Sequence, residues 1–483
     1  MVEIKYKKLF YLAFVILIFT TSVLRVYNIN YEDFWIDEII SFWVAEPQIA
    51  LNETLERHKI LENSPFFFNL SLKYIFSIFG YSPEIGRLYV SLLSIFSTLL
   101  LILIFKNNEP SAIYKKLFLT TLLCFNIYLI KYSQEVRLYS LIFFLFSLNI
   151  VFIVRIFNSN IETFNFTKII IFVFLNILLL MTHPFIVSIY LSYFIFSLFY
   201  YIFQKKNLIN YNISLVLLFL FSILYFYLFL QNTTHIPLWI DPFNIKFFTN
   251  FFFSKFFGSR LIGLIFLIIL IYLILKNIRL VKYNKNQLLL LIMVLCTYAL
   301  PIIYSIIIRP AMVDRYVIFV LIPILVLLSD YVFEIKNSLL KYSLIFTLLL
   351  FTIGNFTTET TFKQFFSTQQ KHKSDYQNLF IQIKKSKINA YAFNLDKTYL
   401  DKEKLGIAFS KYVTNYKKIS NSNLEYFYYK KTPQKNSDIQ EIWVICSQHL
   451  NGPECLKPLV FSNYLIIEEY HFNSLNLKLL KNN

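Results

Sequence analysis

The sequence is short of charge, glycine and cysteine. Charged residues make up only 15% of the 483 residues, whereas 57% are hydrophobic. The apolar residues fall in blocks of roughly 16 to 22, the length that a bilayer core requires. This pattern excludes a soluble globular protein and is typical of a polytopic membrane protein. Glycine is scarce, with seven residues, whereas Phe, Ile, Asn, Lys and Tyr are in surplus. This bias indicates an AT-rich coding sequence rather than a function.

Four cysteines are too few for a disulfide framework. Cys124 and Cys296 lie inside apolar blocks, where cysteine packs as a small hydrophobic side chain. Cys446 and Cys455 lie in the C-terminal segment and can pair only if that segment is outside the cytoplasm. Their pairing stays open at this level.

The sequence also lacks internal repeats, Gly- or Ser-rich linkers and the inverted repeats of many secondary transporters. Its net charge of +18 comes mainly from Lys and Arg in short loops between apolar blocks and in the C-terminal segment. In a membrane protein such residues set orientation. The charge therefore predicts no nucleic-acid partner.

We predict about eleven membrane spans from the apolar blocks. A further apolar stretch, residues 66–79, is short, carries Lys73 and follows a proline, so we expect an interfacial or re-entrant helix there. The predicted spans cover residues 9–27, 88–105, 116–131, 138–156, 168–182, 185–203, 211–230, 262–276, 287–308, 315–333 and 341–356.

The positive-inside rule orients these spans. Sixteen lysines and arginines of the N-terminal segment and of alternate loops then fall on one side, which is cytoplasmic, and the loop 28–87 faces outward. Residues 1–356 would form the membrane module. Residues 357–483 are polar and contain the strand-like runs 390–394 and 442–446, which predict a small extracytoplasmic α/β domain.

Two adjacent carboxylates, Asp37 and Glu38, follow the first apolar block in the segment Phe-Trp-Ile-Asp-Glu. They lie at the expected membrane surface and begin an apolar helix-like stretch. One interpretation is that they cap the N-terminus of that helix. The other is that Asp37 is a general base that deprotonates an acceptor hydroxyl.

The outer loop ends in a second group of polar residues. Glu62, Asn63, Ser64 and Pro65 precede one apolar stretch, and Arg87 precedes the next. Proline before each stretch predicts a sharp turn. Arg87 is either an anchor at the membrane surface or a phosphate ligand.

Two more groups lie between spans on the predicted outer face. Glu135 and Arg137 either pair with each other or are functional, since a guanidinium offers a planar fork to phosphate oxygens. His183 taken alone is as much a packing histidine as a ligand. Arg315, beside Asp314 and Tyr316, would add a second cation for a phosphodiester.

Taken in order, these motifs resemble one family. The segments are Phe34-Trp35-Ile36-Asp37-Glu38, Asn63-Ser64-Pro65, Gly80 with Arg87, Ser133-Gln134-Glu135-Val136-Arg137-Leu138-Tyr139, Thr182-His183 and Asp314-Arg315-Tyr316. Their order resembles the GT-C glycosyltransferases related to protein O-mannosyltransferases and the lipid A aminoarabinose transferase, especially bacterial relatives of unassigned acceptor. The resemblance covers roughly residues 9–335. It departs at Asn63-Ser64-Pro65, where relatives carry His-Pro-Pro or Lys-Pro-Pro.

The resemblance implies a GT-C fold and a transferase of the cell membrane that acts on the extracytoplasmic face. It would move a hexosyl or pentosyl group, with inversion, from a polyprenyl-phosphate donor to a lipid, glycan or protein acceptor. Asp37 and Glu38 would be catalytic, and Arg137, Arg315 and Arg87 would bind the donor phosphate. Substrate contacts would come from Glu135, Tyr139, Asn63, His183 and Tyr316. No cofactor is required, although some relatives use a divalent metal ion, for which Glu62 or His183 would be the ligands here.

Two rival functions stay open. A transporter or flippase of lipid-linked sugars would also be polytopic, but it needs polar gates on both faces. A membrane-anchored binding protein would act through its C-terminal segment and leave Asp37 dispensable.

Overall fold

The long apolar blocks of the sequence form helices. The computed structural model describes residues 2–62, 64–106, 111–159, 164–204, 208–232, 255–278, 284–358, 373–386, 388, 390–394, 402–415, 425–426, 440–447 and 464–482. In this described part, seven helices are long and apolar enough to cross a membrane by length and composition. Each of the predicted spans coincides with helix over most of its length. The chain is therefore a polytopic helical membrane protein with a small sheet domain near its C-terminus.

Two compact units divide the chain, and neither is continuous in sequence. The first comprises residues 1–27, 90–134 and 138–362, and the second comprises 28–89, 135–137 and 363–483. The outer loop thus belongs with the C-terminal segment, because the two are joined by hydrogen bonds and ion pairs described below. The predicted boundary at residue 356 follows chain order and stays a prediction.

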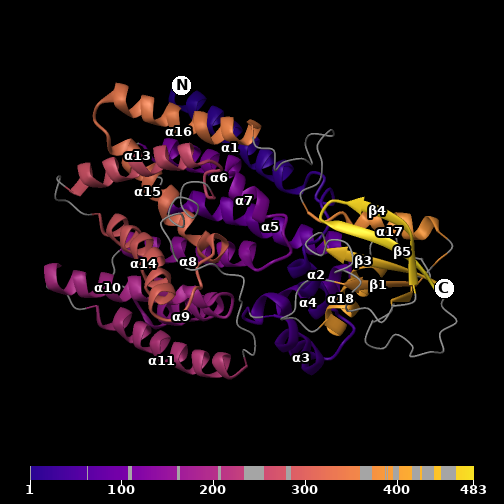
Figure 1. Cartoon of the computed structure of the whole chain (residues 1–483). Helices are drawn as coiled ribbons and strands as arrows, with labels where there is room; N and C mark the ends of the chain where they lie inside the picture. Colours follow the sequence, from indigo (N-terminus) through magenta and orange to yellow (C-terminus); the bar gives the residue numbers. More distant parts are fainter. Residues whose placement is uncertain are drawn as a thin grey trace. The chain divides into compact units, whose positions relative to one another are not determined.

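The first unit is a bundle of apolar helices (Figure 1). Within it α6 packs against α1, α15 and α16, and α10 packs against α11 and α14. Its helices are α1 (Val2–Val26), most of α5 (Pro83–Leu101), η1 (Ile102–Ile104), α6 (Ala112–Phe125), α7 (Ile127–Tyr132), α8 (Tyr139–Ser159), α9 (Phe166–Leu180), η3 (Pro184–Ile186), α10 (Val187–Gln204), α11 (Ile209–Asn232), α13 (Arg260–Ile278), α14 (Lys285–Ile307), η5 (Asp314–Val320), α15 (Leu321–Glu334) and α16 (Ser338–Thr358).

The predicted span 116–131 is two helices, α6 and α7, separated at Asn126. The Asn126 side chain accepts a hydrogen bond from the Leu129 backbone N–H (2.9 Å) and so caps α7. The carbonyls that α6 leaves unpaired at its end are bound by the fully buried Arg25, whose Nη2 donates to the Leu123 oxygen (3.0 Å). A buried cation thus stabilises a helix break inside the bundle.

The second unit contains short helices and a sheet. The helices are α2 (Ile36–Val44), α3 (Leu51–Leu61), α4 (Phe67–Phe79), α17 (Tyr376–Lys385) and α18 (Lys402–Thr414). At 13 residues α4 is too short to span a bilayer unaided, and it ends at Gly80, whose φ of 102° suits only glycine. The predicted helix at 66–79 is therefore confirmed, and its interfacial position stays a prediction.

The sheet has five strands in the order β2-β1-β3-β5-β4. Its strands are β1 (Ala390–Asn394), β2 (Glu425–Tyr426), β3 (Glu441–Ser447), β4 (Tyr464–Phe472) and β5 (Leu475–Asn482). β1 pairs in parallel with β2 and β3, whereas β5 is antiparallel to β3 and β4. The strands predicted at 390–394 and 442–446 are confirmed as β1 and β3.

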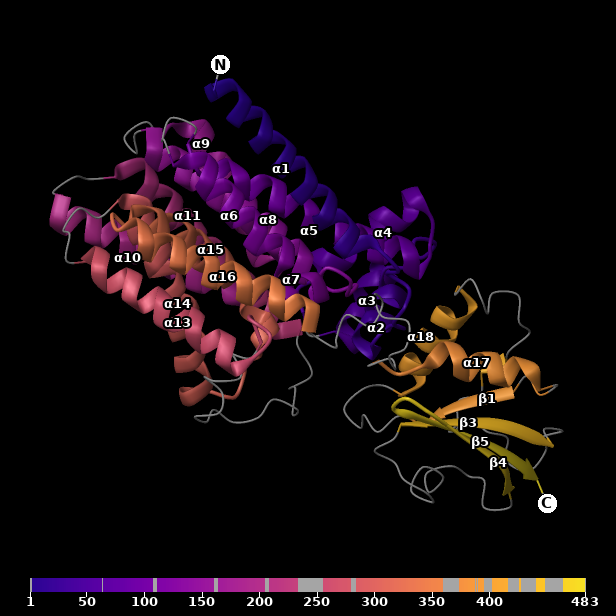
Figure 2. The ribbon, with the colours of Figure 1, turned by 90° about the horizontal axis from the view of Figure 1, so that it is seen from above.

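The two helices of the sheet domain cover one face of it (Figure 2). Tyr391 and Phe393 project to the same side of β1 because strand side chains alternate. Phe380 of α17 lies 5.3 Å from the Tyr391 ring, and Phe409 of α18 lies 4.4 Å from the Phe393 ring. This aromatic layer is the core of an α/β domain. Cys446 of β3 is buried and disulfide-bonded, and Cys455 lies outside the described residues.

Candidate functional site

The two predicted catalytic carboxylates occupy the first turn of α2. The helix begins at Ile36, after its N-cap residue Trp35, and Asp37 and Glu38 are its second and third residues. The Trp35 backbone N–H donates to Glu38 Oε2 (2.8 Å), so Glu38 satisfies a donor that the helix start leaves open. The capping interpretation therefore applies to Glu38.

Glu38 and Asp37 have different surroundings. Glu38 has no exposed surface, and its Oε2 also accepts from Lys373 Nζ (2.6 Å) while its Oε1 accepts from the Val136 N–H (2.9 Å). Asp37 is only half-buried. Asp37 is therefore less enclosed than Glu38, whose carboxylate is surrounded by protein donors.

Arg137 is held against the same helix. Its Nη1 donates to the Asp37 backbone oxygen (3.0 Å) and to Ser41 Oγ (2.7 Å). Both of its terminal nitrogens also bind Glu62, Nη1 to Oε1 and Nη2 to Oε2 (3.2 Å). The Arg137 guanidinium therefore pairs with Glu62, and the Glu135 backbone oxygen accepts from the Arg137 backbone N–H (2.7 Å).

Glu62 lies at the C-terminal end of α3 and is almost fully buried. Beside the Arg137 pair, it accepts hydrogen bonds from Ser41 Oγ (3.0 Å) and Ser64 Oγ (3.3 Å). This network joins α2, α3 and the segment 135–137 in one polar cluster. Asn63, predicted to contact substrate, lies outside the described residues.

His58 fixes the turn next to this cluster. Its Nδ1 accepts from the Asn69 amide (3.0 Å), so the ring proton lies on Nε2, which donates to the Ser64 oxygen (2.8 Å). Burial lowers the pKa of His58, because it disfavours the charged imidazolium. The side chain is thus a neutral structural histidine.

Arg87, in the second unit, has unsatisfied donors. Its guanidinium lies 4.9 Å from the Phe34 ring centroid, and Nη1 donates to the Ile29 oxygen. Nε and Nη2 are buried and have no hydrogen-bond partner among the described residues. Buried donors normally find a partner. Arg87 therefore has two buried N–H groups that the described residues leave unsatisfied.

The remaining predicted residues belong to the first unit. Tyr139 begins α8 and is buried, with its ring 5.0 Å from the ring of Tyr132. His183 accepts from the Phe185 N–H through Nδ1 (3.2 Å) and lies 5.1 Å from the Tyr316 ring. Burial lowers the pKa of His183 to about 3. Arg315 is half-buried in η5. The structure thus brings His183 and Tyr316 together.

The residues predicted as metal ligands fit a metal poorly. Glu62 is engaged by Arg137 and two serines, and His183 Nδ1 accepts from the Phe185 N–H. Among the described residues no cluster of three or more His, Cys, Asp or Glu has metal-binding geometry. We therefore derive no step through a metal ion.

Two residues of the cluster were missed by sequence reasoning. Ser41 lies one helical turn after Asp37, so the four-residue spacing could have placed it on the same face. Lys373 contacts Glu38 across 335 positions of sequence, and no local pattern signals that pairing.

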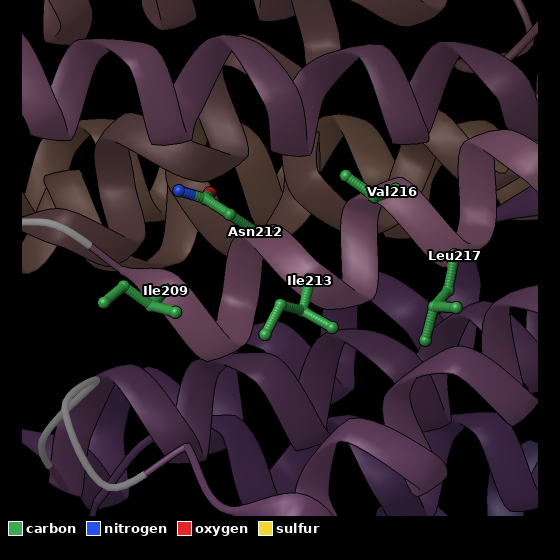
Figure 3. Close-up of a pocket in the computed structure, with 5 residues that line it drawn as sticks. All are labelled: Ile209, Asn212, Ile213, Val216 and Leu217. Carbon is green, nitrogen blue, oxygen red and sulfur yellow. The ribbon is translucent and has the colours of Figure 1, made fainter.

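An apolar pocket lies elsewhere, along α11 in the first unit (Figure 3). Its volume is about 400 Å³, and its lining residues are Ile209, Asn212, Ile213, Val216 and Leu217. None of these is a predicted site residue. The outward apolar side chains of α11 are those expected of a helix that faces lipid.

The helical bundle, the outer-loop helices and the C-terminal sheet domain together constitute a GT-C membrane fold. The chain is similar to two solved structures of the lipid A aminoarabinose transferase ArnT from Cupriavidus metallidurans. With the form bound to undecaprenyl phosphate the TM-score is 0.56 at 10% identity, covering 98% of both chains. With the apo form it is 0.56 at 9% identity, covering 99% of this chain and 98% of that one.

No protein-family model matches the chain, and no curated protein sequence matches it significantly. The likeness to ArnT at such low identity shows the fold. The predicted resemblance to this group of GT-C proteins is confirmed at that level.

Proposed function

We propose that the protein is an integral-membrane glycosyltransferase. It would move a sugar from a polyprenyl-phosphate donor to an acceptor hydroxyl of a lipid, glycan or protein, on the extracytoplasmic face of the cell membrane. The observation that carries the proposal is the contrast between Asp37 and Glu38 on this fold. Asp37 is half-buried, whereas Glu38 has no exposed surface. Such an arrangement leaves Asp37 as the less enclosed of two carboxylates in the first turn of α2.

The choice of donor comes from the fold. One of the ArnT structures that the chain resembles contains undecaprenyl phosphate. A donor of the same lipid class suits a chain with this many apolar helices. The disulfide at Cys446 supports placing the second unit outside the cytoplasm, since disulfides persist in oxidising compartments.

Asp37 takes the proton of the acceptor hydroxyl as the acceptor oxygen bonds to the anomeric carbon. The bond from that carbon to the phosphate oxygen breaks on the opposite face, and the polyprenyl phosphate leaves with the electron pair. The configuration at the anomeric carbon is therefore inverted.

Cationic side chains stabilise the charge that develops on the leaving phosphate. Arg87 has two N–H groups without a partner among the described residues, whereas the Arg137 side chain binds Glu62. We therefore assign the phosphate contact to Arg87 ahead of Arg137. The role that we assign to Arg137 is to hold the α2 backbone at Asp37. Arg315 stays a second candidate for the phosphate.

The test is a transfer assay in liposomes with a panel of radiolabelled polyprenyl-phosphate sugars and a mixture of envelope acceptors. Removing the general base in Asp37→Asn should lower kcat by about 10²–10⁴-fold. The matched control is Glu53→Gln, a carboxylate of the same loop that is 48% exposed and pairs with Arg57. This control should transfer sugar at the wild-type rate.

Retained transfer by Asp37→Asn would reject Asp37 as the base. If labelled donor crosses the bilayer without leaving its carrier, and Asp37→Asn does the same, the protein is a flippase instead. The donor that is consumed identifies the sugar.

A further inference from the structure

The C-terminal segment binds both ends of α2. At the start of the helix, Lys373 pairs with Glu38, whose side chain is fully enclosed. At the end of the helix, Lys411 of α18 pairs with Glu46, and this lysine side chain is 36% exposed. The first ion pair is buried on both sides, whereas in the second only Glu46 is buried, and Glu46 also pairs with Arg57.

Lys373 is itself fixed in place. Its backbone N–H donates to Glu32 Oε2 (3.0 Å), and its backbone oxygen accepts from Asn473 Nδ2 (2.9 Å) in the connection between β4 and β5. Its ammonium lies 5.7 Å from the Trp35 ring centroid. The sheet domain thus holds the Lys373 backbone, and the Lys373 side chain holds the first turn of α2.

Asp37 is next to Glu38 in that turn, so any shift of Glu38 displaces Asp37. We infer that Lys373 is a positioning residue for Asp37, and that the C-terminal domain is a working part of the transferase site. The inference rests on the proposed function for its kinetic consequence, whereas the structural contact can be tested without it.

Loss of the Lys373 cation leaves the Glu38 carboxylate buried without its counter-charge, a state that proteins avoid by moving the group toward water. A displacement of about 1 Å in a reacting group can cost about 100-fold in rate. Lys373→Met should therefore lower kcat by about 100-fold with little change in KM for the donor, the pattern expected of a residue that acts through Asp37.

Three further variants separate positioning from general damage. Lys373→Arg keeps the cation and should restore most of kcat. Glu38→Gln/Lys373→Met removes both charges and should be more active than Lys373→Met alone, because no unpaired buried charge is left. Lys411→Met is the matched control, and its kcat should stay near wild type because Glu46 keeps its ion pair with Arg57 (2.8 Å).

A measurement independent of activity tests the contact itself. Hydrogen exchange of the amides in residues 36–44 should accelerate in Lys373→Met but not in Lys411→Met, while exchange in α8 stays unchanged. Equal exchange in the two variants, or equal kcat, would overturn the positioning role. If the wild type transfers no sugar at all, the proposed function fails, and the exchange result alone decides whether Lys373 positions α2.

Discussion

Removal of the Arg137 guanidinium should destabilise the second unit more than loss of any exposed charge in it. Arg137→Gln deletes the contacts to the Asp37 oxygen, to Ser41 and to both Glu62 oxygens. Glu62, whose side chain is only 5% exposed, would keep two serine hydroxyls as partners and lose its only described cation.

The size of the effect follows from this burial. Breaking one side of a buried ion pair costs about 3–5 kcal/mol, because the remaining charge is left without compensation. For a unit of 150–250 residues, about 1 kcal/mol shifts the melting temperature by about 2–4 °C. Arg137→Gln should therefore lower the melting temperature of the second unit by about 6–20 °C.

Tryptophan fluorescence during heating in detergent is a suitable assay. Trp35, Trp43 and Trp443 lie in the second unit, so three of the four tryptophans report on it. Glu62→Gln/Arg137→Gln should melt above Arg137→Gln, because the double change leaves no unpaired charge.

The control is Lys481→Gln, which removes an ion pair to Glu441 whose lysine is 55% exposed. An exposed pair contributes about 0–1 kcal/mol, so this variant should melt close to wild type. If Arg137→Gln melts no lower than Lys481→Gln, the buried network of Arg137 and Glu62 does not hold the unit together.

Two further predictions concern the second unit. Burial lowers the pKa of His58 in the folded protein. As the pH falls below about 6.5, His58 therefore binds a proton more readily in the unfolded chain than in the folded one, and the free energy of unfolding should fall. Melting between about pH 7.5 and pH 5 should therefore show a smaller loss in His58→Gln than in wild type, and an equal loss would contradict this account. Because Cys446 is disulfide-bonded while Cys124 and Cys296 are free, denatured protein should titrate two thiols before reduction and four after it. Four thiols before reduction in protein purified without reductant would place the second unit in a reducing compartment.

Much of the fold could be predicted from local patterns. Each apolar block became helix because a bilayer leaves backbone groups no other partner. The break at Asn126 inside the predicted span 116–131 was missed, since its stabilising partner Arg25 lies about a hundred residues away. The strands at 390–394 and 442–446 were found because their apolar runs match buried strands.

The candidate site was predictable in its members but not in its pairings. The order of the motifs identified Asp37, Glu38 and Arg137. The sequence left open whether Arg137 pairs with Glu135, and the ion pair between Arg137 and Glu62 was not predicted. The two adjacent acids also differ in burial, because Asp37 is half-buried and Glu38 has no exposed surface.

The sequence by itself determined that the protein spans a membrane, that a small α/β domain follows, and which acids and arginines are worth testing. These conclusions rest on period, length and motif order, which are local properties of a chain. Only the tertiary structure decided that the outer loop and the C-terminal segment form one unit, and that Lys373 holds the helix of Asp37. Ion pairs between residues hundreds of positions apart form only when the tertiary fold brings distant segments together, and no local sequence pattern encodes that long-range contact.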